Sequence, residues 1–196
     1  MRIIVFDTET TSLKPGQICQ LAYLIVEDGA VTGKNMFFTV DEMNERSQGI
    51  HGFSMEMLKE LSGGLRFEDR AAEIHADFSA ADVIAGHNVS FDIRFLTAEF
   101  ERCALSMPKA KPFCTMNYFT GNMMMRRKFQ AYRPKPPKLV ELKEYFSLDD
   151  NEIEQNSEKW FGGGAASHDA RFDTAMTYMC LKAAEEKGIL KNTDSH

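Results

Sequence analysis

The sequence lacks paired cysteines, a positive net charge and a long apolar run, and each absence excludes a class of protein. The 196 residues contain four cysteines but no CxxC pair, which argues against a zinc site and favours reduced thiols in the core. Near the N-terminus only Ile3–Phe6 are apolar before Asp7 interrupts the run. We therefore expect neither a signal peptide nor a membrane span, and predict a cytoplasmic protein with no membrane partner.

The formal net charge of -6 means that the chain has no overall positive field to attract phosphates. A polyanionic substrate would have to meet local positive charge instead. Divalent cations bound in an acidic cleft would supply it, because such ions are the largest charges in their surroundings.

The composition is that of a globular protein, with 43% hydrophobic and 27% charged residues. The length fits one domain, and we find no internal repeat or linker. We expect a single domain over residues 1–196.

The hydrophobic pattern predicts strands first and then a mixture of helices and strands. An apolar run at 2–6 predicts a buried strand that ends at Asp7, and a hairpin signal at Asp28-Gly29 separates two further strands, 18–26 and 35–40. The remaining predictions are a strand at 83–85, helices at 54–61, 67–78, 91–100, 115–125, 139–146 and 169–187, a basic loop at 126–138 and an acidic, then glycine-rich segment at 149–167. This order predicts an α/β domain with helices covering a mixed sheet.

Two carboxylates at the end of the first predicted strand, Asp7 and Glu9, are separated by one residue and therefore point to the same face, where they can converge on a cation. The alternative is an ordinary polar turn. Asp92 lies in the first turn of a predicted helix, where the helix dipole favours an acid whatever the function.

His168 and Asp173 flank the start of the last predicted helix. Five helical steps of about 100° would turn them roughly 140° apart, so His168 must lie before or at the cap. Ser167 or Asp169 can cap the helix, leaving Asp173 in its second turn. Taken alone, His168 is explained equally well as a surface or capping residue.

Three strings together, FDTETTSL, GHNVSFDIRFL and SHDARFDT, resemble the motifs of the DEDDh 3′-to-5′ exonucleases, the group that contains the proofreading epsilon subunit of bacterial DNA polymerase III. The resemblance extends from about residue 3 to 185, with Ser12 where many members have glycine and a longer, more acidic stretch at 149–166. It implies a ribonuclease H-like fold whose first three strands are antiparallel. It also implies these catalytic positions: the metal-binding carboxylates Asp7, Glu9, Asp92 and Asp173, and the general base His168.

The chemistry of phosphodiester hydrolysis is consistent with such a set. Two cations about 4 Å apart can assist both the attacking water and the departing oxygen. Oxygen ligands favour two Mg²⁺ or Mn²⁺ ions. We expect Asp7 to bridge the ions, Glu9 and Asp173 to complete the first, Asp92 to support the second, and His168 to deprotonate the water.

The resemblance also indicates substrate contacts. His51 and Phe53 are predicted to touch the terminal sugar or base, with Thr10 and Leu13 lining the same pocket; a core position is the alternative for Phe53. Asn88 is predicted to hydrogen-bond either a phosphate or its own turn.

Two loops have open interpretations. Six basic residues without an acid lie between Thr115 and Val140, which predicts either a track for single-stranded nucleic acid or a solvated loop. Gly162–Gly164 before His168 predicts a loop that closes over substrate, or a plain insertion.

We therefore predict a 3′-to-5′ exonuclease that acts on single-stranded or frayed 3′ ends, on DNA rather than RNA, and releases nucleoside 5′-monophosphates. The alternatives are an RNA-trimming exoribonuclease of the same superfamily and a non-catalytic nucleic-acid-binding module. No evident polymerase-binding tail follows Lys187, so association with a polymerase is left open.

Overall fold

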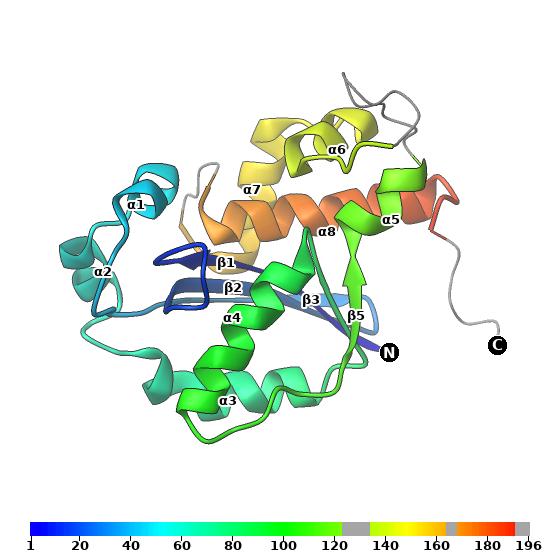
Figure 1. Cartoon of the computed structure of the whole chain (residues 1–196). Helices are drawn as coiled ribbons and strands as arrows, with labels where there is room; N and C mark the ends of the chain where they lie inside the picture. The colour runs from blue at the N-terminus through cyan, green and yellow to red at the C-terminus, as the bar shows by residue number, and fades with distance from the viewer. Residues whose placement is uncertain (123–133, 164–167, 191–196) are drawn as a thin grey trace.

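The computed structural model describes residues 1–122, 134–163 and 168–190 (Figure 1). It contains a five-stranded sheet and eight labelled helices within these ranges. In chain order the elements are β1 (Arg2–Thr10), β2 (Ile18–Glu27), β3 (Ala30–Phe37), α1 (Glu45–His51), α2 (Met55–Leu61), α3 (Phe67–Ser79), β4 (Val83–Gly86), α4 (Val89–Arg102), β5 (Lys111–Cys114), α5 (Thr115–Asn122), α6 (Leu139–Phe146), α7 (Asp150–Phe161) and α8 (Ala170–Glu186).

The strand order is β3-β2-β1-β4-β5, so β1 is central. β1, β2 and β3 form the predicted antiparallel meander, and β4 and β5 continue the sheet in parallel with β1. Asp28 and Gly29 have positive φ angles of 50° and 80°, as a tight two-residue hairpin turn requires. The predicted mixed sheet with three antiparallel strands is confirmed.

Two predicted strands had wrong boundaries. β1 does not end at Asp7 but continues to Thr10, because β2 pairs with it along that whole length. β3 spans Ala30–Phe37 rather than 35–40, because the short turn brings Ala30 directly opposite Glu27 and the pairing with β2 ends at Phe37.

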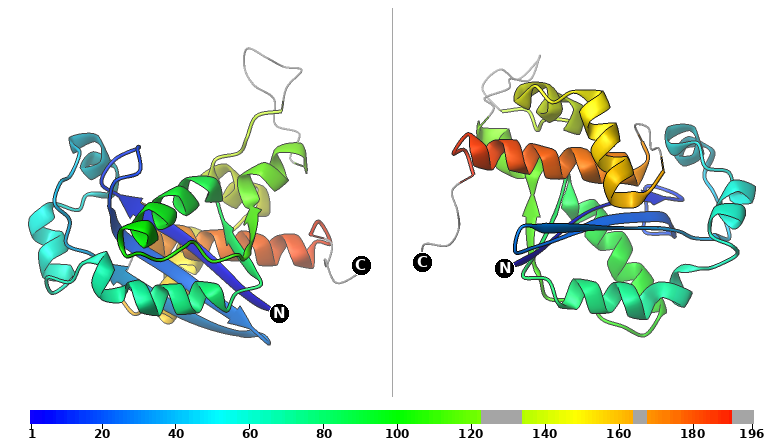
Figure 2. Two further views of the ribbon diagram at one scale, coloured as in Figure 1. Left: turned by 60° about the horizontal axis from the view of Figure 1, so that its bottom comes forward. Right: turned by 180° about the vertical axis from the view of Figure 1, so that it is seen from behind.

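Helices cover both faces of the sheet (Figures 1 and 2). α3 and α4 pack on the face that contains Ile4 and Phe6, and the resulting core is rich in phenylalanine. α7 and α8 lie on the opposite face, where Val5 and Leu24 are buried. Alternate residues of β1 therefore belong to different layers, which places Asp7 and Glu9 on the α8 side.

Three elements were not predicted from the sequence, namely α1, β5 and α7. α7 occupies the acidic segment, where Asp149 caps it by accepting a hydrogen bond from the Asn151 amide. Its last turn lies directly against β3, because a Cβ atom at Gly33 would overlap the carbonyl of Trp160. The acidic segment is therefore an integral layer of the fold.

Some predictions fall outside the described residues: the part of the basic loop from 126 to 133 and the loop residues Gly164 to Ser167. The end of the basic loop is described, and its Pro137 carbonyl lies 3.0 Å from Nε2 of His87. Among the helices in the described ranges, none has the length and apolar character needed to cross a membrane.

Candidate metal centre and catalytic site

The centre begins with Asp7 and Glu9, which share one face of β1. In the register with β2, Asp7 lies opposite Ala22 and Glu9 lies opposite Gln20. Both carboxylates are half-buried beneath the first turn of α8. β1 therefore directs two acidic side chains toward the N-terminus of α8, where the carboxylates are partly shielded from water.

Asp173 joins this pair from α8. Asp7, Glu9 and Asp173 each offer a carboxylate oxygen, and the three oxygens lie within 4.8 Å of one another. The sequence placed Asp173 in the second helical turn, but α8 begins at Ala170, so Asp173 lies in the first turn. The donor set fits a hard divalent cation, because three convergent carboxylate oxygens match the ligand preference of such ions.

Asp92 reaches the centre from the other face of the sheet. It lies in the first turn of α4, is only 3% exposed, and accepts a 2.7 Å hydrogen bond from the Thr8 hydroxyl. The preceding turn is tight: Asn88 has a left-handed φ of 65°, and a Cβ atom at Gly86 would lie 3.0 Å from the Phe6 carbonyl. This turn starts α4 at Val89, two residues earlier than predicted.

Without a counter-ion, the four carboxylates are costly to ionise, because they are buried and repel one another. Burial, together with the charges of Asp92, Asp173 and Glu9, raises the pKa of Asp7 well above its ordinary value. Burial and neighbouring acids raise the pKa of Glu9 to about 9. Burial raises the pKa of Asp92 to about 7 against the opposing hydrogen bond from Thr8. A bound cation would relieve this repulsion and favour the ionised forms.

His168 lies immediately before the N-cap of α8, as predicted. It is exposed and has a left-handed φ of 63°. Burial raises the pKa of Asp173 to about 6, whereas the charge of the nearby His168 lowers it. The role of His168 as general base stays a prediction.

Asp169 is the residue that caps α8, accepting from the Arg171 amide at 2.9 Å. Its carboxylate also accepts from the Gln20 side chain and from the Arg171 guanidinium. The roles of Gln20, Arg171 and the hydroxyl of Thr8 were not predicted from the sequence. Gln20 had left a signal, because it is a lone polar residue within the apolar run of β2.

The predicted substrate residues have unequal surroundings. Leu13 is 59% exposed and Asn88 is also exposed, so both are available to a ligand. Thr10 is buried, and its hydroxyl donates to the Ser12 carbonyl at 3.0 Å. His51 accepts from the Phe53 amide at 3.1 Å and stacks on the Phe53 ring.

Phe53 also contacts Phe37 edge to face, with ring centroids 5.3 Å apart. Phe53 is therefore partly buried and packs against the small core cluster of Cys19, Val40 and Leu58, which agrees in part with the alternative of a core position. Whether these five residues touch substrate stays a prediction.

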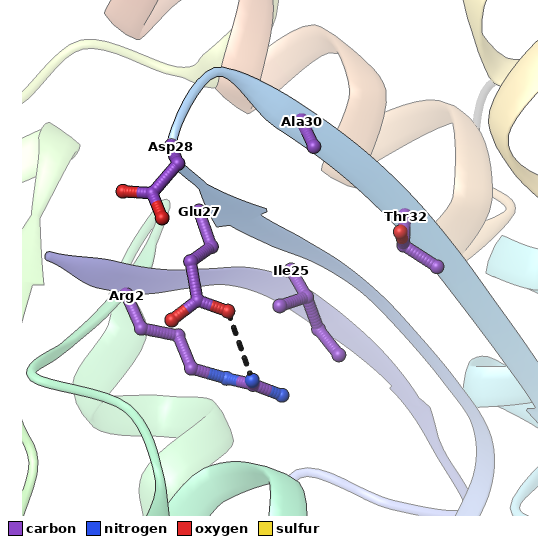
Figure 3. A pocket seen from close by; sticks show the side chains of 6 residues that line it. All are labelled: Arg2, Ile25, Glu27, Asp28, Ala30 and Thr32. Carbon is purple, nitrogen blue, oxygen red and sulfur yellow. Dashed lines mark hydrogen bonds and ion pairs between the residues drawn. The ribbon is translucent and has the colours of Figure 1, made fainter.

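A separate hollow of about 420 Å³ lies at the hairpin end of the sheet (Figure 3). It is lined by Arg2, Ile25, Glu27, Asp28, Ala30 and Thr32. Arg2 is paired with Glu27 at 3.2 Å, so its charge is compensated. The hollow adjoins the start of β1, whereas the carboxylates lie toward the other end of that strand.

The chain is similar in sequence to an exonuclease family and to bacterial DNA polymerase III proteins. The profile of an exonuclease family, named for RNase T, matches residues 4–180. The chain is 30% identical over 137 residues to the DNA polymerase III epsilon subunit of Escherichia coli, covering 65% of this chain and 54% of that protein. It is 32% identical over 104 residues to the PolC-type DNA polymerase III of Latilactobacillus sakei, covering 50% of this chain and 7% of the polymerase. The chain thus spans about half the length of the epsilon subunit and a small part of PolC.

Solved structures show the same fold. Exonuclease I of Escherichia coli, solved with a dA16 oligonucleotide, superposes with a TM-score of 0.72 at 16% identity, covering 94% of this chain and 41% of that one. The ribonuclease H-like architecture predicted from the motifs is confirmed.

Proposed function

The chain belongs to the exonuclease family, and we propose that it is a metal-dependent 3′-to-5′ exonuclease that removes nucleoside 5′-monophosphates from the 3′ ends of single-stranded or frayed DNA. One observation carries the proposal. Asp7 and Glu9 on one strand and the distant Asp173 place carboxylate oxygens within 4.8 Å of one another, and the buried Asp92 lies near enough to raise the pKa of Asp7.

The carboxylates would hold two divalent cations, Mg²⁺ or Mn²⁺. We assign Asp7 to both ions, Glu9 and Asp173 to the first, and Asp92 to the second. When bound, such ions would supply positive charge for the phosphate and would lower the pKa of a bound water. The raised pKa values support this assignment, since clustered acids that resist ionisation alone become good ligands when a cation compensates them.

His168 would accept the proton of the attacking water. An imidazole has an ordinary pKa of about 6.5 and therefore suits a general base near neutral pH. His168 is exposed just before the start of α8, so its ring is accessible to a water and a phosphate bound at the carboxylate cluster.

Single-stranded DNA is the proposed substrate class. Exonuclease I structures with the same fold contain dA16 and dT13 oligonucleotides, and the matching curated relatives are DNA polymerase III proteins. Exposed Leu13 and the half-buried His51 and Phe53 offer apolar and aromatic surface for a terminal base, which suits sequence-tolerant stacking. A fixed polymerase partner is not part of the proposal.

The test gives the purified protein 5′-labelled single-stranded DNA and RNA of the same sequence, with Mg²⁺, Mn²⁺ or a chelator. We expect a descending ladder from DNA that requires a metal and disappears in Asp7→Asn. Internal cuts, or no cleavage of either strand, would contradict the proposal. A ladder from RNA alone would replace the DNA assignment with the exoribonuclease alternative.

A further inference from the structure

We propose that Gln20 is a positioning residue for His168, acting through the N-terminus of α8. The inference rests on the proposed function, since it assigns Gln20 a role in setting the general base. Gln20 is fully buried on β2, directly opposite Glu9, so it does not itself contact solvent.

The Gln20 amide group is hydrogen-bonded on both sides. Its nitrogen donates to Asn35 Oδ1 and to Asp169 Oδ1, both at 2.9 Å. Its oxygen accepts from the Ala170 amide at 3.1 Å. The partners fix the orientation, because a backbone N–H can only donate and a carboxylate can only accept. Gln20 thereby ties β2 and β3 to the first two residues at the start of α8.

Asp169 is held from its other side by Arg171. The guanidinium donates from Nε at 2.9 Å and from Nη2 at 2.7 Å, a two-point contact that fixes the plane of the carboxylate. The same guanidinium lies over the ring of Phe37, 5.8 Å from its centroid, and Phe37 is the β3 residue opposite Gln20. Asp169 is therefore clamped between the sheet and its own helix.

This clamp controls the direction in which the chain enters α8. His168 has a φ of 63°, a conformation that is strained for a residue with a side chain and persists only when its neighbours impose it. The residue that follows His168 is Asp169, and Gln20 is hydrogen-bonded to both Asp169 and Ala170. Loss of the Gln20 bonds would let the backbone at His168 relax and move its imidazole.

Asp173 has a different anchor. The hydroxyl of Thr174 donates to the Ala22 carbonyl at 3.2 Å, and Thr174 is fully buried. Ala22 lies opposite Asp7, so this bond fixes α8 above the metal-binding carboxylates. The two anchors make separable predictions: Gln20 governs the general base, and Thr174 governs the metal ligand.

The experiment compares Gln20→Met, which keeps the shape but loses the amide group, with Thr174→Val in steady-state digestion of single-stranded DNA. For Gln20→Met we expect kcat to fall about tenfold or more, with KM for DNA and the Mg²⁺ concentration for half activity changed less than about twofold. For Thr174→Val we expect a higher Mg²⁺ requirement. A raised Mg²⁺ requirement in Gln20→Met would overturn the assignment.

A double-mutant cycle separates positioning from general damage. If Gln20 acts through His168, then Gln20→Met should lower kcat less than about twofold in a His168→Ala background. An equal loss in both backgrounds would show that Gln20 does not act through the imidazole. A wild-type protein without exonuclease activity would instead refute the proposed function itself.

Two further measurements do not depend on Gln20→Met being active or well folded. Gln20→Glu keeps an acceptor for the Ala170 amide but replaces the donor to Asp169 Oδ1 with a second carboxylate, so kcat should fall. Amide exchange at Ala170 in metal-free protein should be faster in Gln20→Glu than in wild type. Unchanged exchange at Ala170, or wild-type kcat in Gln20→Glu, would overturn the proposal.

Discussion

The hydroxyl of Thr8 donates a 2.7 Å hydrogen bond to Oδ1 of Asp92, joining β1 to the first turn of α4 across 84 positions of sequence. Because residues alternate along a strand, Thr8 faces α4 while Asp7 and Glu9 face α8. Three consecutive residues of β1 therefore organise acids from both layers of the fold, and the strand itself sets the geometry of the centre.

Removing this bond should make activity more dependent on pH. In Thr8→Val the buried Asp92 carboxylate loses the donor that opposes the burial effect on its pKa, so the pKa should rise from its value of about 7. We expect kcat to fall more at about pH 6.5 than at about pH 8.5, with a stability loss of about 1 kcal/mol. A pH–rate series with denaturant unfolding measures both effects. The same fractional loss of kcat at each pH would contradict the prediction.

Metal binding should stabilise the protein more at high pH. The folded-state pKa values of Glu9, Asp92 and Asp173 are raised to about 9, 7 and 6, above their ordinary values near 4. A raised carboxylate pKa contributes stability that is fully present below the unfolded pKa near 4 and is lost as the pH rises from there through the folded values of about 6, 7 and 9. Mg²⁺ restores it, so the Mg²⁺-induced rise in Tm should be larger at about pH 8.5 than at about pH 5.5. An equal rise at both would argue against binding at these acids.

Neutralising one of the carboxylates should lower activity but raise the stability of the metal-free protein. We expect Asp7→Asn and Asp173→Asn to lose at least about a hundredfold in kcat, because the loss of metal contact removes several kcal/mol of transition-state stabilisation. Metal-free Asp7→Asn should nevertheless be more thermally stable than wild type, since it removes charge repulsion in a buried cluster. Digestion assays and thermal unfolding in chelator measure the two effects. Activity comparable to wild type would refute the assigned roles.

His168→Ala should separate chemistry from metal binding. General-base removal costs about a hundred- to ten-thousandfold in kcat, whereas the carboxylates are untouched. We therefore expect the Mg²⁺-induced rise in Tm to stay within error of wild type while kcat collapses. A variant that retains wild-type kcat would remove His168 from the mechanism, and one that loses the Tm response would place it among the ligands.

The contact between α7 and β3 should be intolerant of a single methyl group. Gly33→Ala places a Cβ atom into the Trp160 carbonyl, and overpacking of this kind costs about 1–3 kcal/mol. Gly49→Ala is the matched control, because Gly49 lies in α1 with open space around it. This substitution should leave the free energy of unfolding unchanged or raise it by about 0.5–1 kcal/mol. Chemical denaturation of both variants measures the change in unfolding free energy. An equal change in the two variants would mean that α7 can shift away from β3 without loss of stability.

Local pattern was sufficient for much of the site. Asp7 and Glu9 share a face because a strand has a period of two, and Asp169, one of the two predicted cap residues, caps the helix that carries Asp173, although Asp173 lies in its first turn rather than the predicted second. The hairpin at Asp28 and Gly29 follows from residues that tolerate positive φ. These features depend on neighbours in sequence, so the sequence by itself determined them, as it did the motifs that indicated the family.

The tertiary structure alone decided how those acids meet and what holds them. That Thr8 bonds Asp92, or that Gln20 clamps Asp169, depends on which strand and helix lie against each other, and no local pattern encodes a contact across 84 or 149 positions. Helix α7 escaped prediction for a related reason: its isolated sequence is acidic and polar, and packing of Trp160 against β3 and Tyr178 stabilises it. Burial also sets the raised pKa values of the centre, because desolvation exists only once the layers have closed around the carboxylates.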